Sequence, residues 1–316
     1  SKGNVLDPID LIDGIELEDL ITKRTQNLMQ PQMIKTVAKN TRKEFPHGIA
    51  AHGTDALRFT FCALATTGRN LNFDMGRIEG YRNFCNKIWN AARYALSNCQ
   101  PLESIQRTTF ATKNPYDKWI ISSLSSTIEN VRHSLSDYRF DLASSYIYEF
   151  VWTDYCDWYL EFSKVIYVSK NDADIKETRN VTSYVLSNVI IMFHPIMPFF
   201  TEHLWREVDF ISNKSPKKVI NSNWPMIDLP SKSNDEDIES LMKIISAIRS
   251  ARSELNVPVK SMLTIKYRDD QTQIKKIFST YDQTIESIAK VNRFNCLDGE
   301  RLEGDCLLYT SDAADE

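Results

Sequence analysis

The sequence predicts a mainly α-helical protein in which an antiparallel helix bundle is followed by a small α/β appendix. Long segments carry apolar residues at intervals of three and four, which is the period of an amphipathic helix. These segments are separated by short breaks at Pro101, Pro195 and Pro198, and long helices joined by short breaks pack as an antiparallel bundle. Only Ser261–Tyr267 alternates like a strand, and it lies between two helical patterns near the C-terminal end.

Composition limits the classes of function that the whole chain can indicate. At 316 residues the chain is long enough for two domains or three small ones. Its hydrophobic fraction of 42% and charged fraction of 25% are those of a globular protein. The net charge is −4, so the overall balance does not predict nucleic-acid binding, and a basic surface would have to be local.

Neither a membrane segment nor a metal site is expected. No apolar run approaches the roughly 18 residues that span a bilayer, and Ser1–Asn4 lacks the features of a signal peptide. The five histidines are dispersed, and the cysteines include no Cys-x-x-Cys pair, so we expect reduced thiols in a cytoplasmic protein. The six cysteines are Cys62, Cys85, Cys99, Cys156, Cys296 and Cys306.

The N-terminal region, residues 1–70, mixes turn signals with short helical patterns. Pro8 suits the first turn of a helix. Further along, Thr54 or Asp55 is expected to cap a short helix over Ala56–Ala65. This region therefore predicts a linker of short helices before the bundle.

The bundle is expected over residues 71–229. The aromatic side chains crowded into Asp141–Tyr167 are interpreted as core rather than as a stacking platform, because a helix apolar on so much of its circumference packs against several neighbours. His194 and His203 lie at or near helix breaks and are interpreted as capping or packing residues. The expected helices are Asp74–Asn98, Pro115–Tyr138, Asp141–Tyr167, Asp174–Phe193 and Phe199–Val208.

The appendix is expected over residues 230–303, and residues 304–316 resemble translated vector sequence and are left out of the fold. A helix capped by Asn234 or Asp235 is followed by the strand and by a helix over Gln271–Ile288. Its first helix carries an apolar stripe: Ile238, Leu241, Ile245, Ile248 and Leu255. Two interpretations remain open for its basic residues, contact with backbone phosphate or a solvated face that suits a helix C-terminus. These residues are Arg249, Arg252 and Lys260.

Tyr81–Tyr94 predicts a helix with two opposed faces. One face is apolar and the other carries cations, amides and an aromatic hydroxyl without a carboxylate, which are groups that contact phosphates and unpaired bases. The alternative is that this face is merely the polar back of a buried helix. The apolar face comprises Tyr81, Phe84, Cys85, Ile88, Ala92 and Ala95. The polar face comprises Arg82, Asn83, Asn86, Lys87, Asn90, Arg93 and Tyr94.

Four stretches, taken in order, resemble the valyl-tRNA synthetases, a family of class I aminoacyl-tRNA synthetases. The resemblance runs from Ser1 to about Glu300. The segment Gly14–Gly53 distinguishes the valyl family from the isoleucyl and leucyl families. The matching stretches are Ser1–Pro8, which resembles the end of the Lys-Met-Ser-Lys-Ser signature loop, His52–Phe59, Gly80–Tyr94, and the bundle landmarks Tyr148–Phe150, Cys156–Glu161 and His194–Phe199.

The resemblance implies a fragment that recognises tRNA. Residues 1–70 would be the end of the catalytic domain and a linker, and residues 71–229 the anticodon-binding bundle. The intact enzyme would use ATP and Mg²⁺ to attach valine to its tRNA. Of the signature loop only Ser1 is present, so Ser1, Gly3 and Asn4 are a remnant of the ATP loop. We expect no catalytic or metal-binding residue in the chain, and no ATP or Mg²⁺ bound by it alone.

The expected partner is valine tRNA, and we expect a monomer. On the resemblance, the polar face of the Asp74–Asn98 helix, expected to be free of carboxylates, would lie along the anticodon arm. The main candidates for tRNA contact are Lys87, Arg93 and Tyr94, and the second choices are Arg82, Asn86 and Asn90. Asp55 and Arg58 are expected to form an ion pair that holds the linker helix to the bundle rather than to touch RNA.

Two other classes stay open on the residues alone. The chain would suit a stand-alone helical RNA-binding module, or a helical scaffold that binds no nucleic acid. No repeat of 30–50 residues predicts a solenoid. The piece of signature loop at Ser1 argues against both classes, because neither has a use for it.

Overall fold

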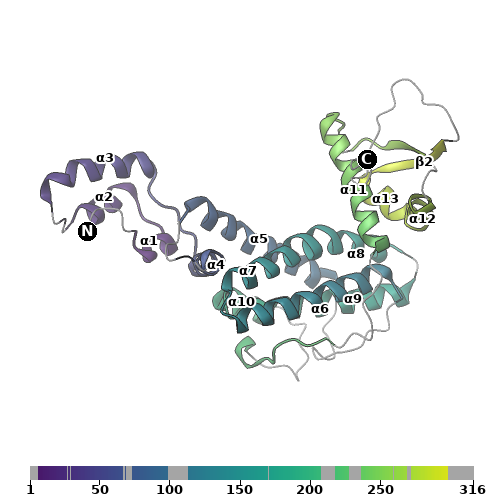
Figure 1. Cartoon of the computed structure of the whole chain (residues 1–316), viewed down its shortest axis with the longest axis horizontal. Helices are drawn as coiled ribbons and strands as arrows, with labels where there is room; N and C mark the ends of the chain where they lie inside the picture. The colour runs from purple at the N-terminus through teal and green to yellow at the C-terminus, as the bar shows by residue number, and fades with distance from the viewer. Residues whose placement is uncertain are drawn as a thin grey trace. The chain divides into compact units, whose positions relative to one another are not determined.

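The computed structural model confirms the mainly α-helical fold (Figure 1). It describes residues 6–26, 28, 30–66, 68, 73–98, 113–169, 171–207, 218–227, 236–258, 260–268 and 272–297. The described residues group into two compact units. Unit 1 is drawn from 1–106, 127–152 and 186–225, and unit 2 from 107–126, 153–185 and 226–316. No helix in these described ranges is both long and apolar enough to cross a membrane. The expected boundaries at 70, 229 and 303 stay predictions.

Short helices form the N-terminal part of unit 1. They are α1 (Pro8–Asp13), α2 (Leu17–Thr25), the 3₁₀ turn η1 (Pro31–Met33), α3 (Ile34–Glu44) and α4 (Thr54–Leu64). Asp7 caps α1 by accepting a hydrogen bond from the Ile9 N–H at 3.0 Å, as the Pro8 start predicts. The helices α2 and α3 lie side by side (Figure 1). A buried core cluster of this part of unit 1 comprises Leu11, Leu20, Phe45, Ile49, Ala56, Leu57 and Ile78.

The tight turn between α3 and α4 depends on Gly48. Its φ is +74°, and a Cβ at this position would lie 2.3 Å from the Ile15 carbonyl oxygen. Ile15 and Ile49 form an antiparallel bridge beside it, with both N–H···O hydrogen bonds at 2.9 Å. The glycine thus permits the close approach of two backbone segments that joins the α1–α2 connection to the α3–α4 connection.

An aromatic cluster forms the centre of unit 1. It joins α4, α5 (Met75–Asn98), α7 (Phe140–Glu149) and the end of α9 (Asp172–Phe193). The Phe84 ring centroid lies 4.5 Å from that of Tyr148, 5.8 Å from Phe59 and 5.7 Å from Phe193. Such pairs add about 0.5–1.5 kcal/mol each beyond their buried area. The cluster therefore fixes α5 against three other helices.

The predicted helix over Asp141–Tyr167 is not a single α-helix. Between α7 and α8 (Leu160–Tyr167) lies a π-helical segment, η2 (Phe150–Tyr159). The sequence gives no warning of it, because a run that is apolar at most positions has no clear period to break. Its interpretation as core is confirmed, since Phe150, Tyr155 and Tyr159 are at most 2% exposed. Tyr146 is the exception, with 37% of its surface exposed.

A buried polar network in unit 2 joins α6 (Pro115–Ser136), η2 and α9. The Tyr159 hydroxyl donates to one Asp117 oxygen at 2.8 Å, and the Thr178 hydroxyl donates to the other at 2.8 Å. Burial, reinforced by the charge of Asp117, holds the pKa of Tyr159 well above its usual value. At the start of α6 the Asn114 side chain accepts a hydrogen bond from the Tyr116 N–H at 2.9 Å and so caps the helix.

The C-terminal part of unit 2 has the predicted α/β character but a different element order. It comprises α11 (Glu236–Glu254), β1 (Leu263–Arg268), α12 (Thr272–Thr280), α13 (Asp282–Ala289) and β2 (Val291–Leu297). The predicted helix over Gln271–Ile288 is broken at Tyr281, which is buried in a non-helical conformation. The strand β2 was not predicted. It pairs with β1 in parallel, with Leu263 opposite Val291.

Candidate nucleic-acid interface

Helix α5 has the two faces that its sequence predicts. On the apolar face Phe84, Ile88 and Ala92 are at most 1% exposed, and Tyr81 and Cys85 are half-buried. Burial raises the pKa of the Cys85 thiol to about 12. The polar face is therefore the outer side of a helix that is anchored along its length.

Four of the six predicted contact residues form one exposed row on α5. They lie within about 80° of one another at 100° per residue, and we call them the α5 ridge. The ridge comprises Arg82, Asn86, Asn90 and Arg93, and all four residues are exposed. Two guanidinium groups and two amides along one helix face present planar donors and acceptors to solvent.

Lys87 and Tyr94 lie beside the ridge and are half-buried. The Lys87 ammonium nitrogen is 3.6 Å from the centroid of the Trp152 ring, which in turn stacks on Tyr148 with centroids 5.6 Å apart. The carbonyl oxygen of Tyr94 accepts hydrogen bonds from the Ser97 hydroxyl and the Asn98 amide. Lys87 is thus held by a cation–π contact, which sequence reasoning did not foresee.

The ridge is not free of carboxylates at its N-terminal end. Glu79 is exposed and lies one turn before Arg82 on the same face. His52 lies close to both charges. Burial, and then the charge of Arg82, lower the pKa of His52, while the charge of Glu79 opposes the shift. The stretch without carboxylates therefore begins at Arg82.

Asp55 and Arg58 hold α4 to the bundle, but not through the predicted ion pair. Asp55 accepts a hydrogen bond from the Phe200 N–H and so caps the start of α10 (Pro198–Glu207). Arg58 donates from Nε to the Ile196 carbonyl at 2.8 Å. Each side chain thus binds main-chain groups of the turn before α10, because helix ends leave such groups unsatisfied.

The predicted side-chain cap of α4 is wrong. Gly53 occupies the N-cap position, and neither Thr54 nor Asp55 caps this helix with its side chain. Burial raises the pKa of Asp55, while its hydrogen bond from Phe200 and the charge of Arg58 lower it. The net shift is upward.

Both histidines at helix breaks have packing roles, as predicted. His194 Nδ1 lies 2.8 Å from the Thr201 hydroxyl. The His203 ring stacks on Trp89 of α5, with centroids 5.5 Å apart and planes 17° apart. His203 thus helps to fix the α5 helix.

Of the three basic residues considered for phosphate contact, Arg252 is buried, and the interpretations of Arg249 and Lys260 stay open. Arg252 is 8% exposed and donates to the carbonyls of Pro258 at 2.8 Å and Ser261 at 2.7 Å, so it holds the connection from α11 to β1. Both interpretations of Arg252, phosphate contact and solvated face, are therefore wrong. Leu255 was predicted to belong to the apolar stripe, but it is 60% exposed and lies just beyond the end of α11, so this part of the prediction is wrong.

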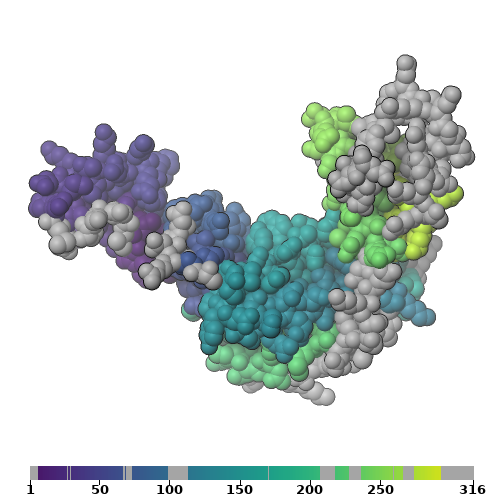
Figure 2. All heavy atoms as spheres, viewed as in Figure 1, coloured from purple at the N-terminus to yellow at the C-terminus, as the bar shows by residue number. Residues whose placement is uncertain are grey.

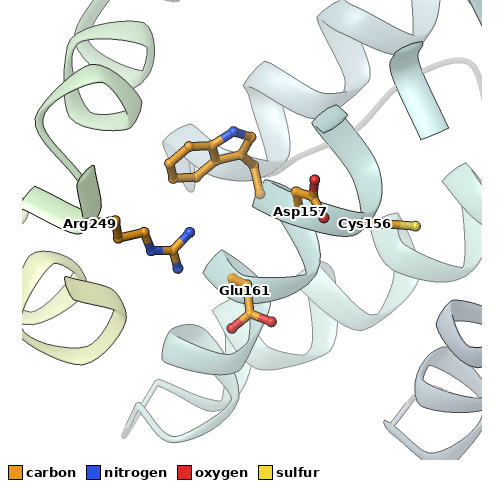
Figure 3. A pocket seen from close by; sticks show the side chains of 5 residues that line it. Cys156, Asp157, Glu161 and Arg249 are labelled. Carbon is orange, nitrogen blue, oxygen red and sulfur yellow. The ribbon is translucent and has the colours of Figure 1, made fainter. Parts of the chain in front are cut away.

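Arg249 lies at the edge of a hollow of about 340 Å³ in unit 2 (Figure 3). Its guanidinium carbon is 5.6 Å from the centroid of the Trp158 ring. Two carboxylates share the hollow with this single cation, so its charge does not favour an RNA backbone. The lining residues are Cys156, Asp157, Trp158, Glu161 and Arg249.

The predicted ATP-loop remnant, Ser1, Gly3 and Asn4, lies outside the described residues. Within the ranges that are described, no group of three or more histidine, cysteine, aspartate and glutamate side chains comes together to hold a metal ion. The expectation for ATP and Mg²⁺ therefore stays a prediction.

Comparison with known proteins finds a similarity to a tRNA-binding domain. Residues 117–267 match the family described as the anticodon-binding domain of tRNA ligase. This part of the chain is therefore similar to that domain family. The match begins in α6 and ends in β1, so α5 precedes it.

The chain is similar to valine–tRNA ligases over nearly its whole length. The ligase of Coxiella burnetii is 46% identical over 298 residues, which is 92% of this chain and 32% of that protein. The ligase of Legionella pneumophila (strain Lens) is 43% identical, over 94% of this chain and 33% of that protein. The resemblance to the valyl-tRNA synthetases is thus confirmed, and the chain spans about a third of the length of these relatives.

One solved structure has a partial likeness. It is the agnB2 LeuRS of Agrobacterium radiobacter K84, in a ternary complex with tRNA and LeuAMS. The likeness has a TM-score of 0.44 and 17% identity, and covers 64% of this chain and 26% of that one.

Proposed function

We propose that this chain is the tRNA-binding part of a valine–tRNA ligase and that its partner is valine tRNA. The observation that carries the proposal is the 42–46% identity to valine–tRNA ligases over most of the chain. The match of residues 117–267 to an anticodon-binding domain supports an RNA partner. Because the net charge of the chain is −4, its RNA-binding surfaces must be local patches of positive charge.

The α5 ridge is the surface that we propose for the anticodon arm. Arg82 and Arg93 can each contact a phosphate or the edge of a base with a planar fork of donors. Asn86 and Asn90 can pair with the exposed edges of unpaired bases, because an amide carries both donors and acceptors. Tyr94 can stack on a base only with the exposed part of its ring.

The activity of the longer enzyme is part of the proposal. It would attach valine to its tRNA with ATP and Mg²⁺, in the cytoplasm, as a monomer. Ser1, Gly3 and Asn4 would approach ATP as the end of the signature loop. None of the described residues is assigned a chemical step, so the 316-residue chain alone should neither activate valine nor charge tRNA.

The proposal is tested by measuring binding of the chain to valine tRNA and to the same tRNA with its anticodon changed, over a range of salt concentrations. The association constant should fall by about 0.7–0.9 log units per log unit of salt for each neutralised phosphate. The anticodon change should weaken binding further. Replacing Arg82, Asn86, Asn90 and Arg93 together by alanine should remove the difference between the two tRNAs.

A control separates loss of recognition from a general loss of positive charge. The Lys113→Gln/Lys118→Gln variant changes two exposed cations outside the ridge and should bind both tRNAs as the parent chain does. Equal, weak binding of the parent chain to both tRNAs would contradict the proposal. In that case the polar face of α5 is the back of a buried helix.

A further inference from the structure

Helix α3 carries a second exposed row of cations, far along the sequence from α5. Lys35, Lys39 and Lys43 follow one another at intervals of four residues, and all three are exposed. Val37 and Thr41, on the opposite side of the helix, are 6% and 0% exposed. Figure 2 shows side chains projecting from this N-terminal, purple part of the surface. We call the three lysines the α3 row.

The other cations around α3 are engaged within the protein. Arg42 pairs with Glu18 at 3.0 Å, Arg24 with Glu44 at 3.4 Å, and Lys23 with Asp7 at 2.6 Å. These pairs connect α3 to α2, and α2 to the start of α1. The lysines of the α3 row form no ion pair with any carboxylate in the described ranges. The row is therefore the part of this positive surface that is left for an external anion.

We propose that the α3 row binds the sugar–phosphate backbone of the tRNA, independently of its sequence. The inference rests on the proposed function and adds a second contact surface to it. Residues four apart on a helix rise about 6 Å along its axis, so the row is a line of separated positive charges. Lysine is a compact point charge that suits phosphate, whereas it does not read base edges with a planar fork. The row includes no amide or aromatic side chain that would select a base.

A lipid surface fits this helix less well than RNA does. A helix that lies on a membrane inserts an apolar face beside its cations. In α3 the face opposite the lysines is already packed in the protein, as the burial of Val37 and Thr41 shows. Because no apolar face is available beside the lysines, the α3 row suits a polyanion in water better than it suits a lipid surface.

The test replaces Lys35, Lys39 and Lys43 by glutamine in the 316-residue chain and measures binding to both tRNAs against salt. Because the glutamine variant leaves three phosphates without a counter-charge, the salt slope should fall by about 2. The affinity at about 50 mM salt should fall at least tenfold, by the same factor for both anticodons. The matched control replaces the three lysines by arginine, which keeps the charge and should keep affinity within about twofold. All three side chains are exposed, so the melting temperature should not change in either variant.

Two outcomes would overturn the inference. Unchanged tRNA affinity in the glutamine variant would do so, and so would a loss confined to one anticodon. Loss of binding to vesicles of phosphatidylserine and phosphatidylcholine, with RNA binding intact, would assign the row to lipid. The Arg93→Ala variant is measured in parallel. If it loses anticodon discrimination while the glutamine variant binds normally, only the α3 row is contradicted. If the parent chain binds no tRNA, the proposed function itself fails.

Discussion

The α5 ridge and the α3 row are two exposed faces of cationic helices, but they differ in chemistry. Each lies opposite a buried side of its helix. The α5 ridge combines two arginines with two asparagines, whereas the α3 row is made of lysines alone. Planar forks and amides can distinguish base edges, while ammonium groups neutralise phosphate without reading sequence. Positive charge alone therefore does not distinguish a surface that reads bases from one that only neutralises phosphate.

The two helices also differ in how they are held. Helix α5 is fixed by the aromatic cluster around Phe84 and by the stack of Trp89 on His203. Helix α3 is held to α2 by a small buried side and by surface ion pairs, which contribute little at ordinary salt. A surface that must place side chains against particular bases benefits from the more rigid support.

Arg93→Ala is expected to have the largest effect on recognition. Removing the guanidinium should cost about 1–3 kcal/mol of binding free energy to valine tRNA if Arg93 contacts a base. The loss should be much smaller with the changed anticodon. Filter-binding or fluorescence titrations with both tRNAs measure this, and Arg93→Lys is the matched control that keeps the charge but not the fork. An equal loss with both tRNAs would make the α5 ridge a phosphate contact like the α3 row.

Asp55→Ala should lower stability rather than recognition. It removes the side chain that caps α10, which costs about 0.5–2 kcal/mol of unfolding free energy. Because Asp55 is distinct from both surfaces, the binding constant of the folded protein should not change. Urea unfolding followed by circular dichroism measures the effect. A change in anticodon discrimination without a change in stability would contradict the role assigned to Asp55.

The same carboxyl gives a prediction for pH. The pKa of Asp55 is raised above its ordinary value of 3.8, chiefly by burial. The folded chain therefore keeps this proton to a higher pH than the unfolded chain does. Its contribution to stability should fall as the pH rises from 3.8 toward the raised pKa. Asp55→Asn keeps an acceptor for the Phe200 N–H and should remove this part of the pH dependence, which urea unfolding at a series of pH values measures.

Lys87→Ala should affect both stability and binding. Loss of the cation–π contact with Trp152 should cost about 1 kcal/mol of unfolding free energy. Lys87→Met keeps the aliphatic stem without the charge and separates packing from electrostatics. Thermal unfolding of the three proteins, beside tRNA titrations, measures both effects. If Lys87→Ala weakens binding with no change in stability, the ammonium group serves RNA rather than Trp152.

Glu79→Gln should have the smallest effect, in the opposite direction. Removing a carboxylate from the N-terminal end of the α5 ridge should raise tRNA affinity about two- to threefold at low salt, and this increase should disappear as salt screens the charges. A matched substitution of the exposed Glu129, which pairs with Arg132, should leave affinity unchanged. Weaker binding in Glu79→Gln would mean that this carboxylate makes a direct contact with the RNA.

Sequence periodicity predicted the faces of α5 because Phe84, Ile88 and Ala92 recur at helical spacing with polar residues between them. It missed η2, because the aromatic run has no clear period, and it missed β2, whose pairing with β1 is not a local property. The expected ion pair of Asp55 and Arg58 is wrong because both side chains bind the main chain of a turn that lies more than 130 residues away in the sequence.

The candidate contacts were predictable as residue types but not in their surroundings. A helical projection gives the α5 ridge, but it does not give the contact of Lys87 with Trp152, which comes from η2. The two faces described over Tyr81–Tyr94 also leave out Glu79, although the expected helix Asp74–Asn98 contains it. Sequence therefore predicts which side of α5 faces outward better than which side chains remain available there.

We expect the α5 ridge to be energetically coupled to the anticodon and the α3 row to be independent of it. The most direct measurement is a pair of thermodynamic cycles, in which the anticodon is changed together with either Arg93→Ala or the glutamine variant of Lys35, Lys39 and Lys43. The account predicts a coupling energy of about 1 kcal/mol or more for Arg93 and additivity within about 0.5 kcal/mol for the lysines. Additivity in both cycles, or coupling only in the lysine cycle, would contradict it.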